Sequence, residues 1–177
     1  MLFRIITLSL VLFSFTAPVN KSDLIPWNES RRLRWSDFKG NPPVNATNAA
    51  LTSSGILFKF STNGESLHYE LSCNFDQNGS WGRVRNDYIL SHEQGHFDIA
   101  EIYTRKLNRA LKRYRYRRAS FNKDVNTIYQ DTMKELQAMQ TEYDHQTDYS
   151  RNPLQQRNWL ARIDKYLEDL EDYSNYR

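Results

Sequence analysis

The amino-acid sequence predicts an α+β fold, in which a small antiparallel sheet from the N-terminal half packs against about three helices from the C-terminal half. Between residues 18 and 85, apolar and polar residues alternate and turn signals are frequent. From Asn86 onward, apolar residues recur every three or four positions, which is typical of helices. The length of 177 residues suits one domain. We therefore expect a single domain over residues 18–177, β-rich over 18–85 and helical over 86–177.

The first seventeen residues are a segment of another kind. Met1–Ala17 contains Arg4 near its start, an apolar run over residues 5–15, and small or polar residues before Pro18. This layout is typical of a secretory signal peptide, and the apolar run is too short to cross a bilayer. We therefore expect residues 1–17 to be a signal peptide, and the mature protein to be exported and either periplasmic or secreted.

The strands are predicted from alternation and from turn residues. Ile56–Phe60 forms one expected strand, Asn63-Gly64 is a strong hairpin signal, and Leu67–Cys73 forms the returning strand. Asn78-Gly79 marks a further turn. Cys73 is the single cysteine, which excludes an intramolecular disulfide and a multi-cysteine zinc site, and we expect it to be a buried thiol.

Three helices are predicted from caps and apolar stripes. Asn86 is a suitable N-cap for the first helix, Ser120 for the second, and Asn152-Pro153 is the favoured start of the third. The stripe of the first helix contains Ile89, His92, His96, Ile99, Tyr103, Leu107 and Ala110, and that of the second contains Phe121, Val125, Ile128, Leu136, Met139 and Tyr143.

The first helix carries the pattern H-E-x-x-H. His92 and His96 lie one turn apart, so both imidazoles can reach one zinc ion, and Glu93 lies beside that face. Zinc lowers the pKa of a bound water to about 7, and the carboxylate of Glu93 is placed to take its proton as general base. The alternative is a pair of core histidines satisfied by hydrogen bonds, which the adjacent glutamate disfavours. Gly95 costs about 1 kcal/mol relative to alanine inside a helix, so we expect another group to approach the backbone there.

Leu90–Ala100 resembles the core of a bacterial family of exported proteins, described as zinc-dependent proteases of the H-E-x-x-H type and largely as a domain of unknown function. Leu33–Gly40 is similar to the W-S-D-F opening of that family, and Tyr143–Thr147 is similar to its Y-D-x-x-T segment. Trp159 matches a later tryptophan, so the resemblance covers most of residues 30–165. It implies a zincin-like active-site helix and a zinc-dependent peptidase activity.

The chain departs from this family pattern at one position. The family has a histidine two residues after the Y-D-x-x-T segment, where this chain has Tyr149. If that histidine is a zinc ligand, this chain has lost it. If it donates a hydrogen bond to the reaction oxyanion, Tyr149 can replace it, because a phenol also donates. We assign the oxyanion role to Tyr149.

The third zinc ligand has to come from another element, because a catalytic zinc site uses three protein ligands and an open position. We choose Asp144, which lies in the family-like segment, over His145 and Asp148. Its alternative is a solvated carboxylate at a helix end. We expect Asp98, on the first helix, to orient a ligand histidine by accepting a hydrogen bond from its ring, without binding the metal itself.

A basic stretch follows the H-E-x-x-H motif. Residues 105–118 contain eight cations and no acid. These cations either complement the dipole at a helix C-terminus, which is the interpretation we favour, or bind an anionic surface of the cell envelope. The net charge of +3 is by itself too small to imply a nucleic-acid or membrane partner, and export disfavours nucleic acid.

Three functions are compatible with the sequence. The leading hypothesis is an exported zinc metallopeptidase with His92, His96 and Asp144 as ligands, Glu93 as general base, Tyr149 as oxyanion donor, and a peptide or protein as substrate. The second is a non-catalytic binding or adaptor protein of the envelope that retains a structural or vestigial zinc site. The third is a metal-free module that binds a surface through Arg105–Arg118.

Overall fold

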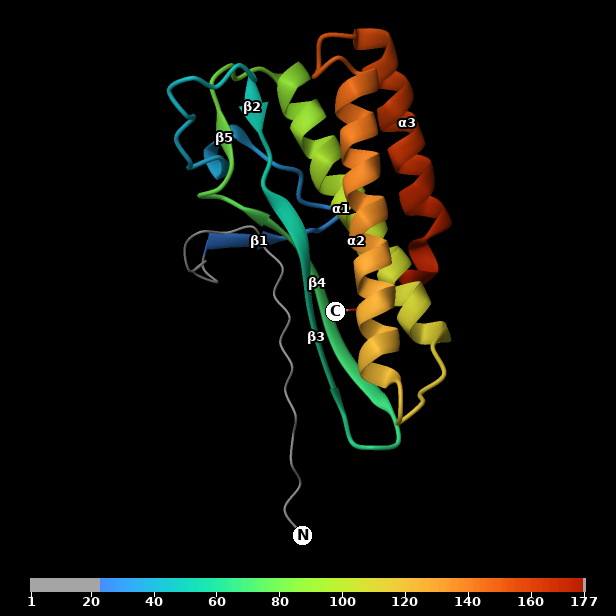
Figure 1. Ribbon diagram of the computed structural model, residues 1–177. Helices are drawn as coiled ribbons and strands as arrows, with labels where there is room; N and C mark the ends of the chain where they lie inside the picture. The colour runs from blue at the N-terminus through green and yellow to red at the C-terminus, as the bar shows by residue number, and fades with distance from the viewer. Residues whose placement is uncertain (1–22, 177) are drawn as a thin grey trace.

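A long antiparallel hairpin forms most of the sheet in the computed structural model, which describes residues 23–176 (Figure 1). Its strands are β3 (Ser54–Thr62) and β4 (Leu67–Asp76). β1 (Leu24–Pro26) pairs with the other side of β4, so the strand order is β1-β4-β3. β2 (Ala50–Leu51) and β5 (Trp81–Gly82) form a separate two-stranded antiparallel sheet. The expected signal peptide, residues 1–17, lies outside the described residues.

The turn of the hairpin is four residues long and contains the Asn63-Gly64 signal that the sequence indicates. Residues 63–66 connect β3 to β4, and Thr62 pairs with Leu67. Gly64 has a φ of 91°, which a side chain would disfavour. The side chain of Asn63 accepts hydrogen bonds from the backbone N–H groups of Glu65 (2.9 Å) and Ser66 (2.8 Å), and so closes the loop. Both strands also extend beyond the predicted ranges.

Three helices follow the sheet, as the sequence predicts. They are α1 (Asp87–Arg113), α2 (Phe121–Gln146) and α3 (Pro153–Asp169). Asn86 and Asn152 are N-caps whose side chains accept backbone hydrogen bonds, at 2.8 Å and 3.2 Å. Ser120 precedes α2, but its hydroxyl donates to Asp124 (2.7 Å) instead of capping the helix. Short 3₁₀ turns occur at residues 35–37 and 171–173.

α1 is the central element, since it packs against the β3–β4 hairpin and against both other helices (Figure 1). The rings of Phe75 and Phe97 join the sheet to α1, with centroids 5.8 Å apart. Phe58 stacks on Tyr129 of α2 (5.4 Å). Cys73 lies in the same core and is 1% exposed, which confirms the expectation of a buried thiol. The domain is therefore α+β, with the sheets in its N-terminal half and the helices in its C-terminal half.

Buried polar groups connect both ends of the described chain to α1. Glu101 and Arg105 form a buried ion pair (2.9 Å), and Tyr176 donates a hydrogen bond to Glu101. At the other end, Gln94 accepts from the backbone N–H of Leu33 (2.7 Å). Residues between β1 and β2 and residues after α3 therefore support the helix that carries the H-E-x-x-H motif. Among residues 23–176, no helix combines the length and the apolar character needed to span a membrane.

Candidate metal centre and its cleft

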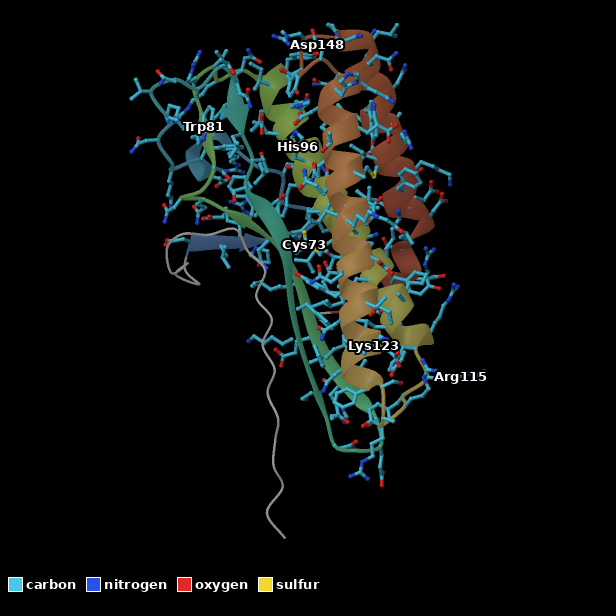
Figure 2. All side chains as sticks on the ribbon, viewed as in Figure 1. Cys73, Trp81, His96, Arg115, Lys123 and Asp148 are labelled. Carbon is cyan, nitrogen blue, oxygen red and sulfur yellow. The ribbon has the colours of Figure 1, made fainter. Side chains whose placement is uncertain are left out.

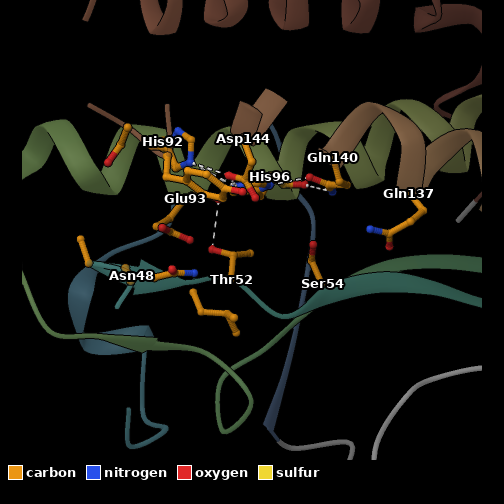
Figure 3. A pocket seen from close by; sticks show the side chains of 14 residues that line it. Asn48, Thr52, Ser54, His92, Glu93, His96, Gln137, Gln140 and Asp144 are labelled. Carbon is orange, nitrogen blue, oxygen red and sulfur yellow. Dashed lines mark hydrogen bonds and ion pairs between the residues drawn. The ribbon is translucent and has the colours of Figure 1, made fainter. Parts of the chain in front are cut away.

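Three side chains from two helices converge on one point (Figure 3). His92 and His96 are on α1, and their Nε2 atoms are 3.2 Å apart. Asp144, near the end of α2, places its Oδ1 atom 3.2 Å from Nε2 of His92 and 3.0 Å from Nε2 of His96. The packing of α2 on α1 thus brings together residues that are 48 or more positions apart in the sequence.

The geometry of this group fits a zinc ion. Zinc bonds of about 2.0–2.1 Å in a tetrahedral site place ligand atoms roughly 3.3 Å from one another. The observed triangle has edges of 3.0, 3.2 and 3.2 Å. Two imidazoles and one carboxylate are also a donor set that catalytic zinc sites use. His92, His96 and Asp144 would therefore be the residues that hold the metal.

Gln140, one turn before Asp144 on α2, fixes the orientation of His96. The Nδ1–H of His96 donates to Oε1 of Gln140 (2.5 Å), and Nε2 of Gln140 donates to the backbone carbonyl of His96 (2.9 Å). With the proton on Nδ1, the lone pair on Nε2 faces Asp144 and the candidate metal position. The sequence alone does not indicate this role of Gln140.

Tyr143 supports His92 from the other side. Its ring stacks on the imidazole with centroids 4.5 Å apart, and its hydroxyl donates to the backbone carbonyl of His92 (3.2 Å). A Cβ atom at Gly95 would be 2.5 Å from the hydroxyl oxygen of Tyr143. The glycine is therefore required by a close approach, which confirms the expectation from its cost inside a helix.

Glu93 presents an unpaired carboxylate oxygen at the site. The residue is 4% exposed, and its Oε2 atom is buried without a hydrogen-bond partner in the described part of the chain. The backbone carbonyl of Glu93 accepts from the hydroxyl of Thr52 (3.2 Å), which connects α1 to the segment after β2. A buried carboxylate oxygen with no protein partner is available to a water molecule or a substrate proton.

The electrostatics of the group keep Asp144 ionised. Burial alone would raise the pKa of Asp144, but the hydrogen bonds with His92 and His96 hold it well below its usual range. Burial lowers the pKa of His92. Burial also acts to lower the pKa of His96, but the hydrogen bond with Asp144 and the charge of Glu93 raise it overall. An ionised carboxylate next to two imidazoles is the state in which these residues can bind a cation.

The group opens onto a cavity of about 380 Å³. His92, Glu93, His96 and Asp144 line one wall, and Asn48, Thr52 and Ser54 from the β2 region line the facing wall (Figure 3). A second cavity of about 710 Å³ shares part of this lining and extends toward the N-terminus of α1. The residues common to both cavities are Asn48, Ala49, Tyr149 and Ser150.

Tyr149 lies in the lining of both cavities, and its side chain is 50% exposed. It belongs to a turn of three consecutive residues with positive φ, namely Asp148 (49°), Tyr149 (52°) and Ser150 (68°). Non-glycine residues in this region are strained, and such strain is concentrated at functional sites. The turn places Tyr149 in the lining of the cavity beside the candidate centre, where its hydroxyl makes no hydrogen bond with residues 23–176.

The alternatives to Asp144 do not reach the centre. His145 is exposed and lines a shallow depression on another face of α2. Asp148 pairs with Arg151 (2.7 Å). The expectation for Asp98 is wrong, because its carboxylate contacts neither histidine. It accepts a hydrogen bond from Trp27 (2.7 Å) and forms an ion pair with Arg32 (3.0 Å). Asp98 holds the N-terminal segment on α1 instead.

Residues 67–151 match the profile of a family described as "Bacterial protein of unknown function (DUF922)". This match covers less of the chain than the residues 30–165 that the motifs indicate. It includes β4, α1 and α2, and therefore Glu93 and the three candidate ligands His92, His96 and Asp144. A search of curated proteins and a search of solved structures each find no match. The chain is thus similar to a bacterial family whose function is not described.

Proposed function

We propose that this protein is an exported zinc-dependent hydrolase that cleaves peptide bonds in a peptide or protein. The observation that supports this best is the combination of a zinc-like triangle of donor atoms with the unpaired carboxylate of Glu93 in the same cavity. A structural zinc site uses four protein ligands, whereas the described residues bring only His92, His96 and Asp144 together.

The residues around the cavity have distinct roles in this proposal. Bound zinc would polarise the substrate carbonyl and lower the pKa of water. Glu93 takes the proton from the attacking water and delivers it to the leaving nitrogen. Tyr149 donates a hydrogen bond to the oxygen of the tetrahedral intermediate. Gln140 and Tyr143 hold the two imidazoles in place.

The experiment that tests the proposal is the substitution Glu93→Gln. Because Glu93 is not among the three converging ligand atoms, the variant should bind about one zinc per chain and fold normally. Its hydrolysis of a diverse peptide library should fall by about 10²-fold or more. Glu135→Gln, at an exposed site on α2, is the matched control and should retain full turnover. Zinc content is measured by mass spectrometry and turnover by product sequencing.

A non-catalytic envelope protein is the second candidate, and the replacement of the family histidine by Tyr149 favours it. It predicts that the wild type binds zinc and hydrolyses nothing, which would overturn the peptidase proposal. Tyr149→Phe divides the outcomes further, since it should lower turnover roughly 10²-fold if the hydroxyl meets the oxyanion. Unchanged turnover in this variant would leave the role of Glu93 intact and remove only the oxyanion assignment.

A further inference from the structure

One end of the molecule carries a group of exposed cations, which we call the basic end. Arg115 and Lys123 lie at this end, near the tip of the β3–β4 hairpin, whereas His96 and Asp148 lie toward the opposite end (Figure 2). Its members come from the last turn of α1, the following loop and the first turn of α2. They are Lys112, Arg113, Arg115, Arg117, Arg118 and Lys123.

The basic stretch of residues 105–118 divides into two parts in the structure. Arg105 is buried and pairs with Glu101, and Lys106 and Arg109 lie over tyrosine rings at 4.0 Å and 5.8 Å. These three cations stabilise the fold. The remaining five cations of the stretch are exposed and belong to the basic end, and one of them, Lys112, also lies over the ring of Tyr173 (5.9 Å).

Few carboxylates neutralise this end. Arg117 pairs with Asp124 (3.0 Å), and that carboxylate also accepts from Tyr114 and Ser120. Among residues 23–176, the structure gives no ion pair to Arg115, Arg118 or Lys123. Glu65 and Glu70 are exposed on the nearby hairpin, and Glu70 lies opposite Lys59 in the strand register. The basic end therefore keeps a positive charge.

Helix stability explains only two of the cations at the basic end. Lys112 and Arg113 lie in the last turn of α1, where the helix dipole favours them. Arg117 and Arg118, however, precede the N-terminus of α2, and Lys123 is in its first turn. Cations are unfavourable at a helix N-terminus, so the dipole of α2 does not stabilise these positions. The favoured sequence interpretation, a helix C-terminus with complementary charge, therefore accounts for only part of the stretch.

The charge is also local. The whole chain has a net charge of +3, while residues 105–118 contribute +8, so the rest of the chain carries −5. Because the positive charge is concentrated at one end and the rest of the chain is negative, the electrostatic field of the protein attracts a negatively charged partner to that end.

We propose that the basic end binds an anionic phospholipid surface. Its cations are spread over a loop and two helix ends, an arrangement that suits an extended charged plane. The half-buried rings of Tyr116 and Phe121, 5.6 Å apart, lie among them, and tyrosine is favoured at membrane interfaces. In this orientation His96 lies toward the end of the molecule that is away from the lipid (Figure 2).

The test uses sedimentation of the purified protein with vesicles. Vesicles with about one third phosphatidylglycerol should bind the protein at low salt, and about 0.5 M salt should release it. Vesicles of phosphatidylcholine alone should not bind it. The double variant Arg115→Gln/Arg118→Gln should bind the anionic vesicles about 10- to 30-fold more weakly, because each cation near the surface contributes about 1 kcal/mol.

The control Lys39→Gln/Arg157→Gln removes two exposed cations away from the basic end and should change binding by less than about twofold. An equal loss in both double variants would show a general charge effect and would overturn the proposal. Tighter binding to soluble polyglutamate than to vesicles would assign the basic end to a polymer instead of a membrane. None of these readouts depends on zinc or on peptide hydrolysis.

Discussion

Gln140 makes both of its hydrogen bonds to a single residue of the candidate metal centre. Its amide oxygen accepts from the ring of His96 and its amide nitrogen donates to the backbone carbonyl of the same residue. Since the two ends of the amide are both used, the side chain and the ring fix one another. In other metal sites a carboxylate or a backbone carbonyl has this function, and its loss weakens metal binding 10- to 100-fold.

Gln140→Leu should therefore weaken zinc binding by about 10- to 100-fold. The leucine is similar in size but cannot accept the proton of Nδ1, so the imidazole loses its preferred tautomer. Competition with a chromophoric chelator measures the affinity, and nitrogen NMR of the metal-free protein measures the tautomer. Gln130→Leu, at an exposed site on the same helix, is the control. An unchanged tautomer in Gln140→Leu would contradict the positioning role.

At the scale of elements, the contact between α1 and α2 depends on a glycine. Gly95 has no side chain, so the hydroxyl of Tyr143 can lie directly against the backbone of α1 at this position. The ring of the same tyrosine stacks on His92. The close packing of these two helices and the orientation of a candidate ligand are therefore determined by one contact.

Gly95→Ala should lower the free energy of unfolding by about 1–3 kcal/mol, because the added methyl group overpacks the contact. This loss should occur even though alanine is favoured over glycine inside a helix by about 1 kcal/mol. Urea denaturation measures it. Ala138→Gly, at an exposed site on α2, reports the helix preference alone. Tyr143→Phe in the Gly95→Ala background should recover part of the loss, with a coupling energy above about 0.5 kcal/mol. A Gly95→Ala variant as stable as the wild type would show that the helices adjust freely.

The elements that sequence can predict here are those determined by local chemistry. Asn86 and Asn152 start their helices through their own side chains, so their positions could be predicted. β1, β2 and β5 could not, because two or three residues are too few to show alternation. The Asn63-Gly64 signal locates the hairpin turn, in which the side chain of Asn63 closes a four-residue loop, whereas the ends of β3 and the C-terminal end of β4 were not predicted.

The candidate site divides in the same way. His92, Glu93 and His96 are recognisable from their spacing along one helix. A family-like segment predicts Asp144, and only the packing of α2 on α1 brings it near the histidines. Gln140 has no sequence signal except its position four residues before Asp144. The role of Asp98 is not predictable from the sequence, because two of its partners, Trp27 and Arg32, are more than 60 positions away along the chain.

At the scale of the whole molecule, the candidate metal centre connects two helices that belong to different parts of the sequence. Two of its ligand atoms come from α1 and one comes from α2. An unfolded chain does not hold these atoms together, so a metal that binds the folded state also stabilises it. Folding and metal binding should therefore be thermodynamically linked.

Zinc at about 1,000 times its dissociation constant should add about 4 kcal/mol to the free energy of unfolding and raise the Tm by roughly 10 °C. Thermal unfolding with zinc and with a chelator measures the difference. Asp144→Ala should lose most of the increase, because two ligands hold zinc weakly. Asp131→Ala, an exposed position on the same helix, should keep it. An equal increase in wild type and Asp144→Ala would place the zinc elsewhere.

Cys73 provides a natural reporter for the opening of this molecule. It is the single thiol of the chain, it is 1% exposed, and it pairs with Ile56 toward the open end of the β3–β4 hairpin. An alkylating reagent can reach the sulfur only when the hairpin separates from the helices. The rate of alkylation, read by intact mass, therefore counts opening events in an unlabelled protein at native concentration. It does so in crude extracts as well, without a substrate, a dye or a purification step.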